Sequence, residues 1–558
     1  MEPGILHQHT YFLFPFSVDR PAVIEDHPEA WSGRPRWIDG LDAWIAAHQR
    51  RESSPVVRHL GSWRRSPYTR FDLESRAYQD MVFFHPFVRR VFFDTGDATA
   101  AGVEKEALLR CYSLPIGHGA RLWLEAQDVK GRSATVEVTD LRLFLFANGI
   151  GILSIGIEAT GLPASQALWI NESMRKVYAS SARQVREGRV PCRLALTVES
   201  EGSRHLIAEE TFQKGEMIGF QPPLAQTITA LLYFADYGEQ EYEPVLDERM
   251  IVYSYSALDA ATLPAGFLDS EEYQVLLSRF LYVDRQGEGF RYEPGFVREH
   301  MRRQMYSRWA HQGTWYGATS YSNITVAVGN FDCDEHLLRE GFLIHRMFVT
   351  RYYLMSLVAL FYRATVLDFA ERTALVSKRL YLDQEDGKLS LENIRLASDL
   401  RAEFLHFANY WCFDELANKD EEQEHFVLQC GQYRIDPMKR EIEQEVEALN
   451  ASLYSYFQFR NTEAVNRLAM LSLILGAGAV LTGFFGMNFG RGFAKVFFEP
   501  GPGATAAHYL AIAAVALLVI GSIGLGFYLV FANWADYRDI LTPRGSRNQG
   551  DTRSLKRG

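Results

Sequence analysis

The sequence predicts a cytoplasmic α/β (α+β) domain, followed by long stalk helices and a C-terminal hairpin of two transmembrane helices. Short β-type runs punctuated by Gly and Pro fill residues 1–333. After Pro437, no proline or glycine occurs until Gly476, which predicts one long helix. Two charge-free runs of 19 and 24 residues, 468–486 and 509–532, are each long enough to cross a bilayer.

The clearest element of the N-terminal domain is a β-hairpin. Asn148-Gly149 lies between two apolar segments, LRLFLFA and IGILSIGIEA, and this dipeptide between apolar runs is a strong hairpin signal. Further strands are predicted at RLWLEA, RLALTVES, MIVYSYSA and NITVAVGN, whereas residues 171–188 have helical spacing and a basic outer face. The domain carries no nucleotide-binding glycine pattern, HExxH or GxSxG, so we expect that the protein is not an enzyme.

Composition excludes some classes of partner and indicates the cellular compartment. The 558 residues exceed what one hydrophobic core usually organises, so two or more structural units are expected. The formal net charge of −11 argues against nucleic acid as a partner, because phosphate binding requires clustered Lys and Arg. Five widely spaced cysteines without a CxxC pair predict neither a disulfide framework nor a structural zinc site. The N-terminus, MEPGILHQHT, lacks the basic start of a secretory signal, so the N-terminal domain is expected in the cytoplasm.

Residues 334–467 form a predicted cytoplasmic helical region. Segment 341–370 is strongly apolar, but His345, Arg346, Arg351 and Arg363 interrupt it and leave the uncharged core 352–362. That core is shorter than the roughly 20 apolar residues of a membrane span, so a helix buried against its neighbours is predicted. For the next helix, Ser390 is the predicted N-cap residue.

The long stalk helix is expected to begin at Asp436-Pro437, with Asp as N-cap and Pro at the first helical position. A helix over 437–488 is roughly 78 Å long at 1.5 Å per residue. Apolar side chains repeat along it at alternating spacings of four and three, at Ile442, Val446, Leu449, Leu453 and Tyr456. This stripe fits helices of the same subunit and a neighbouring subunit equally well.

The charges that flank the two apolar runs predict their orientation. Arg460 and Arg467 precede the first run, and Arg491 and Lys495 lie in the intervening loop 489–508. Six basic residues follow the second run, in the tail 533–558: Arg538, Arg544, Arg547, Arg553, Lys556 and Arg557. Because cytoplasmic flanks carry the excess of Lys and Arg, both termini are predicted inside, with the protein in an inner or plasma membrane.

One face of the first apolar run carries an amide at each end. Helical steps back from Asn488 reach Phe484, Leu481, Ala477, Leu473, Met470 and Asn466. Several copies around an axis would form a pore with a polar ring at each mouth and a hydrophobic constriction between them. Small residues at 476, 478, 479, 482 and 483 allow close helix approach, either between subunits or between two spans of one subunit.

A ring of neutral amides suits magnesium. Mg²⁺ gives up its water reluctantly, so carbonyl oxygens can bind the hydrated ion through outer-sphere hydrogen bonds without holding it tightly. The alternative interpretation of Asn488 by itself is an ordinary residue at a helix C-terminus, where Asn is common.

Gly486-Met487-Asn488, placed directly after a first span and before a second, resembles the signature of the CorA-type magnesium transporter family. The resemblance implies a homopentamer with a funnel-shaped cytoplasmic domain, first spans that line the pore, and these three residues as the ion-selecting ring. It also implies regulatory divalent ions between cytoplasmic subunits, for which Glu441 and Glu445 are the first candidates. Other candidates are Glu443, Glu447 and the acidic residues of 420–424. The chain departs from the family at Phe485, where tyrosine is frequent, and in its larger N-terminal domain.

The function expected from the sequence is passive membrane transport of divalent cations, with Mg²⁺ first and Co²⁺, Ni²⁺ or Zn²⁺ as alternatives in the same fold. An alternative from another class is a membrane-anchored sensor or scaffold without transport. Asn466 and Asn488 favour transport, because an anchor has no reason to place two amides on one stripe with an apolar interval.

Overall fold

The structure is a computed structural model of the chain. It describes residues 2–49, 54–67, 82–94, 108–116, 119–178, 182–200, 202–212, 222–237, 241–246, 249–284, 292–328, 344–385 and 389–486, with scattered residues between 506 and 528. The chain divides into two compact units, Met1–Leu449 and Asn450–Gly558.

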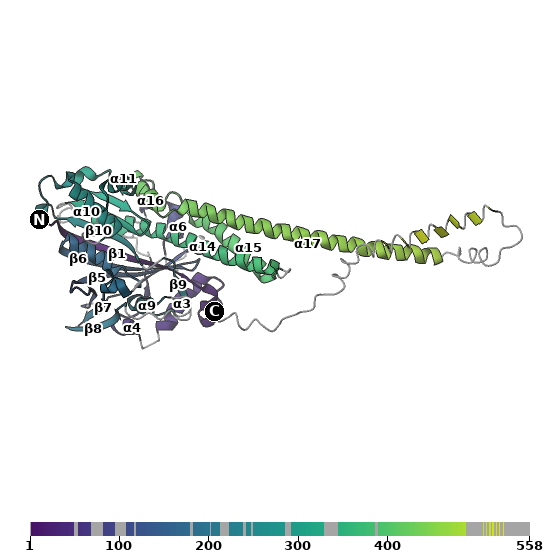
Figure 1. The fold of residues 1–558 in the computed structure, drawn as a ribbon. Helices are drawn as coiled ribbons and strands as arrows, with labels where there is room; N and C mark the ends of the chain where they lie inside the picture. Colours follow the sequence, from purple (N-terminus) through teal and green to yellow (C-terminus); the bar gives the residue numbers. More distant parts are fainter. Residues whose placement is uncertain are drawn as a thin grey trace. The chain divides into compact units, whose positions relative to one another are not determined.

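Unit 1 is built on a mixed sheet of thirteen strands (Figure 1). Ten strands form a continuous path in the order β11 (Met305–Tyr306), β12 (Trp315–Ala318), β13 (Ser322–Val328), β10 (Ile251–Leu258), β1 (Gly4–Val18), β6 (Ile150–Pro163), β5 (Ser133–Phe146), β4 (Arg121–Gln127), β7 (Arg193–Ser200) and β8 (Ser203–Glu210). The other three are β2 (Arg64–Arg65), which pairs with β3 (Leu109–Ser113), itself paired with β5, and β9 (Tyr242–Pro244), which pairs with β1.

Strand β1 is central to this sheet. It pairs antiparallel with β6 along one edge and with β10 and β9 along the other. The neighbouring β10 pairs with β13 in parallel, which makes the sheet mixed. The four strands predicted from RLWLEA, RLALTVES, MIVYSYSA and NITVAVGN are confirmed as β4, β7, β10 and β13.

The predicted hairpin is also confirmed. Strands β5 and β6 are antiparallel neighbours, and Asn148-Gly149 forms the turn between them. Gly149 has φ +94°, a left-handed conformation that glycine adopts without strain. The Asn148 side-chain amide donates a hydrogen bond of 3.0 Å to the Thr365 hydroxyl, so the turn is fixed to the helix that covers this side of the sheet.

The described residues also form α-helices. They are α1 (Arg20–Asp26), α2 (Pro28–Trp31), α3 (Trp37–Gln49), α4 (Pro55–His59), α6 (Pro86–Phe92), α7 (Ala164–Met174), α8 (Ala182–Arg186), α9 (Gln226–Leu231), α10 (Glu271–Tyr282), α11 (Pro294–Gln304), α13 (Ile344–Met347), α14 (Tyr353–Glu385), α15 (Leu391–His406), α16 (Asp420–Gln432) and α17 (Ile435–Gly486). Short 3₁₀ turns are η1 (Ala260–Thr262), η2 (Phe267–Asp269) and η4 (Ala310–Gln312), and π-helical turns are η6 (Phe348–Tyr352) and η7 (Phe407–Trp411).

Helices α7 and α14 cover opposite faces of the sheet. The Thr10 hydroxyl donates to the Asn171 side chain of α7 at 2.9 Å, whereas the ring of the next residue, Tyr11, lies 4.5 Å from that of Tyr353 on α14. Successive strand residues point to opposite faces, so β1 is buried on both sides. Helix α14 also packs against α15 and α16 (Figure 1).

A pair of glycine substitutions tests this packing. Gly151 of β6 lies opposite Phe16 of β1, and a Cβ atom there would meet the buried Phe16 ring at 2.2 Å. We expect Gly151→Ala to lower the free energy of unfolding by about 1–3 kcal/mol, because the ring must move within a packed core. The same change at Gly431 in α16 meets no atom within 4 Å. It should raise stability by up to about 1 kcal/mol through helix propensity, and chemical denaturation of both variants measures the contrast.

The apolar segment around residues 341–370 is a core helix, as predicted. Within the described residues, Ile344–Asp383 is the segment long and apolar enough to cross a bilayer, and 78% of its most apolar window is buried inside the protein. Side chains of α14 such as Phe361 and Tyr362 are almost fully buried.

Two helix starts were predicted, one correctly. The Ser390 hydroxyl accepts a hydrogen bond from the Glu392 amide and caps α15. Helix α17 begins at Ile435 instead of after Asp436, directly behind Arg434, whose φ of +55° separates α17 from α16. Residues 171–188 are also not one helix, because α7 ends at Met174 and α8 covers only Ala182–Arg186.

The predicted CorA-like fold, a cytoplasmic domain followed by a two-helix membrane hairpin, is wrong. The N-terminal part contains a large mixed sheet. Within the described residues, the one helical segment long and apolar enough to cross a bilayer is the core helix Ile344–Asp383. Local patterns do not reveal how strands distant in sequence pair. Of the predicted spans, 468–486 forms the end of α17, while 509–532 lies largely outside the described residues.

Candidate metal centre

Three side chains meet where β1 pairs with β6. His7 and His9 are two residues apart on β1 and therefore point to the same face of the sheet. The register places Glu158 of β6 directly opposite His9. One Glu158 oxygen lies 3.2 Å from His9 Nδ1 and the other 3.5 Å from His7 Nε2.

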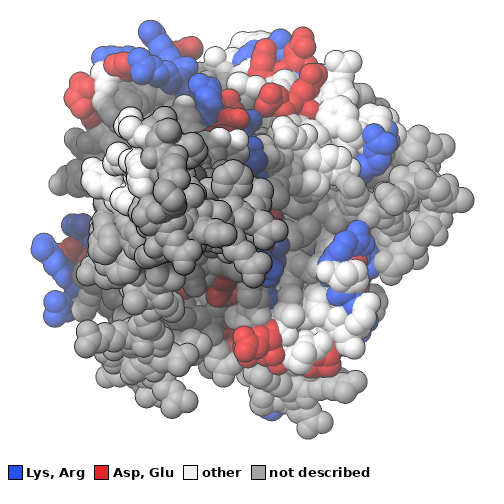
Figure 2. All heavy atoms as spheres, turned by 90° about the vertical axis from the view of Figure 1, so that its right-hand side faces the viewer, with Lys and Arg blue, Asp and Glu red and all other residues white. Residues whose placement is uncertain are grey.

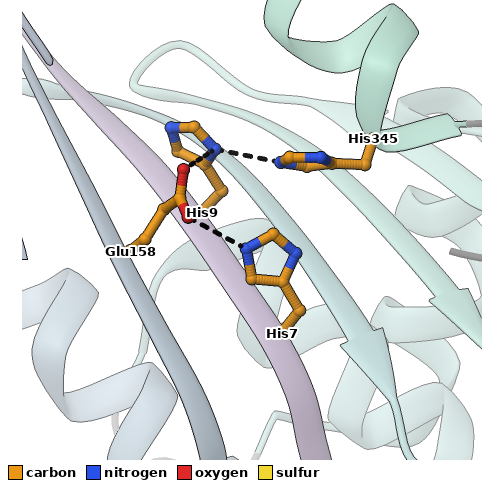
Figure 3. A group of neighbouring side chains, drawn as sticks. All are labelled: His7, His9, Glu158 and His345. Atoms are coloured by element: carbon orange, nitrogen blue, oxygen red, sulfur yellow. Dashed lines mark hydrogen bonds and ion pairs between the residues drawn. The ribbon is translucent and has the colours of Figure 1, made fainter. Parts of the chain in front are cut away.

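The fourth side chain arrives from the helical layer. His345, in the first turn of α13, places its Nε2 atom 3.0 Å from His9 Nδ1 (Figure 3). One possible ligand atom from each of His7, His9, Glu158 and His345 lies within 4.8 Å of the others. We call these four residues the histidine centre.

Burial differs within the histidine centre. The His9 side chain is only 4% exposed, whereas those of His7 and Glu158 are 18% and 38% exposed. His9 stacks on Tyr11, with ring centroids 4.7 Å apart, and His345 lies 5.2 Å from the ring of Tyr255. The centre therefore has a buried, aromatic wall and a side that solvent reaches.

The histidines change the acidity of the carboxylate. The hydrogen bond from His7 lowers the pKa of Glu158, against the opposing effect of burial, and His9 and His345 lower it further by charge. Glu158 is thus held as a carboxylate, the form that accepts hydrogen bonds or binds a cation.

The histidine centre was not predicted from the sequence. The signal it carried was His7-Gln8-His9, two histidines on one face of an apolar strand. Glu158 and His345 lie 149 and 336 residues after His9 in the chain. Only the strand register and the helix position bring them together.

The acidic stretch predicted as a regulatory site is occupied by protein partners. Glu421 accepts a hydrogen bond of 2.8 Å from the Trp309 indole, Glu422 pairs with Arg351 at 3.4 Å, and Glu424 accepts from the Tyr306 hydroxyl. These contacts fix α16 to neighbouring elements.

The first two regulatory candidates lie far from the residues of the histidine centre in the sequence. Glu441 and Glu445 are exposed on α17, one turn apart. Within the part of the chain that the structure describes, neither belongs to a group of potential metal-ligating side chains. Their regulatory role stays a prediction.

The residues predicted to line an ion path lie on α17 or just beyond it. Asn466 is exposed and Met470 is half-buried, while the side chains of Leu473, Ala477, Leu481 and Phe484 lie outside the described residues. Gly486 is the last residue of α17, and Met487 and Asn488 also fall outside. The N-terminal part of the predicted apolar stripe packs within the chain's own unit 1, where Ile442 and Val446 are buried.

In Figure 2, the described acidic and basic side chains of this face form small groups of both signs. Comparison of the chain with protein-family models, curated proteins and solved structures finds no match. The interpretation of Gly486-Met487-Asn488 therefore rests on the residues themselves.

Proposed function

We propose that this chain is an integral membrane protein that transports divalent metal cations, with Mg²⁺ as the first candidate, as a homo-oligomer. The observation that carries the proposal is helix α17, which continues without a break from a highly charged segment into a charge-free segment and ends at Gly486. Met487 and the polar Asn488 follow directly in the sequence. An uninterrupted helix keeps the backbone hydrogen-bonded, which a segment in lipid requires.

Exposed apolar side chains on α17 support a membrane or subunit partner. Leu468, Leu471 and Leu475 are 64%, 56% and 65% exposed in the single chain. Contiguous exposed apolar residues of this size mark contacts with lipid or protein. A homo-oligomer, a pentamer by the family resemblance, buries one side of each helix against its copies and leaves the other to lipid.

The choice of ion rests on ligand chemistry. A ring of Asn488 amides offers neutral oxygen atoms, which suit a hydrated Mg²⁺ ion. Co²⁺, Ni²⁺ and Zn²⁺ remain alternative cargo, and a histidine-rich centre in unit 1 gives no support to Mg²⁺ in particular, because Mg²⁺ prefers oxygen ligands.

Flux through liposomes tests the proposal. The full-length chain is reconstituted with an internal magnesium indicator, and the native protein is compared with Asn488→Ala and Asn461→Ala. On a helix Asn461 projects about 180° from Asn488, at 100° per residue, so it is a matched control off the predicted path. We expect Asn488→Ala to lower Mg²⁺ flux by about tenfold or more, which equals about 1.4 kcal/mol, and Asn461→Ala to leave it unchanged.

One outcome contradicts transport, and another contradicts the role of Asn488. Native protein that gives no Mg²⁺, Co²⁺, Ni²⁺ or Zn²⁺ flux down an inward gradient is a membrane-anchored sensor or scaffold. Equal flux from the native chain and Asn488→Ala removes Asn488 from the ion path.

A further inference from the structure

We infer that the histidine centre of His7, His9, Glu158 and His345 is a resident site for a transition-metal ion of the Zn²⁺, Co²⁺ and Ni²⁺ class. The inference concerns unit 1 alone and does not depend on transport. Its ligands come from three elements, β1, β6 and α13, that meet only in the folded chain.

The spacing of the donor atoms fits such an ion. At Zn–N distances of about 2.0–2.1 Å, neighbouring ligands of a tetrahedral ion lie about 3.3 Å apart. The atom pairs of the centre lie 3.0 Å apart for His9 and His345, 3.2 Å for His9 and Glu158, and 3.5 Å for His7 and Glu158. The two Glu158 distances are to different carboxylate oxygens, and one donor atom from each of the four residues lies within 4.8 Å of the others. Several separations between donor atoms are thus close to the edge length of one coordination tetrahedron (Figure 3).

The donor types select the metal. Three imidazole nitrogens and one carboxylate oxygen match the ligands of Zn²⁺ and its neighbours Co²⁺ and Ni²⁺. Mg²⁺ and Ca²⁺ take oxygen ligands almost entirely, so this set discriminates against them. The centre would therefore bind a transition metal in the presence of excess Mg²⁺.

The surroundings of the centre orient its ligands and leave it accessible to a metal ion. His9 is buried and stacked on Tyr11, so its ring orientation is fixed before a metal arrives. The half-buried side chains of His7 and Glu158 leave an approach from solvent. The competing interpretation is a metal-free cluster held by hydrogen bonds, in which a proton lies between His9 and His345.

Cobalt binding separates the two interpretations. The purified full-length chain is stripped with a chelator and titrated with Co²⁺ in the presence of excess Mg²⁺, and visible absorption is recorded. A tetrahedral nitrogen and oxygen site gives intense d–d bands, and we expect about one Co²⁺ per chain. His7→Ala and His345→Ala should each weaken binding by at least about tenfold, whereas His311→Ala, an exposed histidine on η4, should not.

Thermal unfolding of the native chain gives a second readout that needs no variant. We expect the midpoint to rise when Zn²⁺ is added to the stripped protein, to fall again with chelator, and to stay unchanged with Mg²⁺. Absence of tetrahedral Co²⁺ bands, binding that survives both histidine substitutions, or a midpoint insensitive to Zn²⁺ overturns the inference. Because Asn488→Ala should retain full Co²⁺ binding, failure of the metal site and failure of transport are distinguishable.

Discussion

Asp94→Ala should lower the free energy of unfolding by about 3–5 kcal/mol, because it removes the buried carboxylate between Arg65 and Arg110. Arg65 then keeps the more exposed Asp42 as a partner. The Asp94 carboxylate is fully buried and accepts hydrogen bonds from Arg65 Nε at 2.9 Å and Nη2 at 2.7 Å. It also accepts from the Cys111 backbone amide at 3.3 Å and lies 3.6 Å from Arg110. The carboxylate thus fixes β2 and β3 to each other through their side chains and backbone.

An exposed ion pair provides the control. Arg303 Nη2 and Glu299 Oε1 are 3.0 Å apart on α11, and both side chains are mostly exposed. Glu299→Ala should change stability by less than about 0.5 kcal/mol, since water replaces the lost partner. Urea denaturation of both variants measures the difference. If Asp94→Ala unfolds at the same denaturant concentration as Glu299→Ala, the buried network contributes nothing to stability.

His425 should make the protein sensitive to acid. Its ring packs against those of Tyr316 at 4.2 Å, Tyr306 at 4.5 Å and Tyr352 at 5.1 Å. Burial, assisted by the charge of Arg308, lowers the pKa of His425 to about 3. The charged groups of its own helix nearby, Glu421, Glu422 and Glu424, are engaged with other partners.

Acid destabilises the folded chain because His425 binds a proton more readily in the unfolded chain. Between pH about 6.5 and about 3, the unfolded chain protonates His425 and the folded chain does not, so acidification favours unfolding by up to about 1.4 kcal/mol per pH unit. The substitution His425→Gln removes the side chain that binds this proton. We expect the stability difference between the native chain and the variant to shrink by about 3 kcal/mol between pH 7 and pH 4, as measured by urea denaturation across pH. Parallel pH profiles would show that His425 does not carry the effect.

Local sequence signals predicted local structure well. Asn148-Gly149 identified the β5–β6 hairpin, and Ser390 identified the start of α15, because turn and capping chemistry depends on adjacent residues. Charges within 341–370 separated a core helix from a membrane span, since a span needs an uncharged run of full length.

Long-range structure was not predicted. The parallel pairing of β10 with β13 and the central position of β1 depend on contacts between distant residues. For the same reason the sequence did not show that His345 approaches His9, and the resemblance around Gly486 suggested an architecture that the sheet contradicts. Asp436 failed as an N-cap because Arg434 makes the left-handed turn that begins α17 earlier.

The position of β1 between two partner strands determines how slowly its amide hydrogens exchange with solvent. Residues 7–13 of β1 are paired with both β6 and β10, so exchange there requires the sheet to separate. Deuterium should therefore enter this stretch last, with the rate of global opening. The imidazoles of His7 and His9 are thus attached to a backbone segment that is paired on both edges.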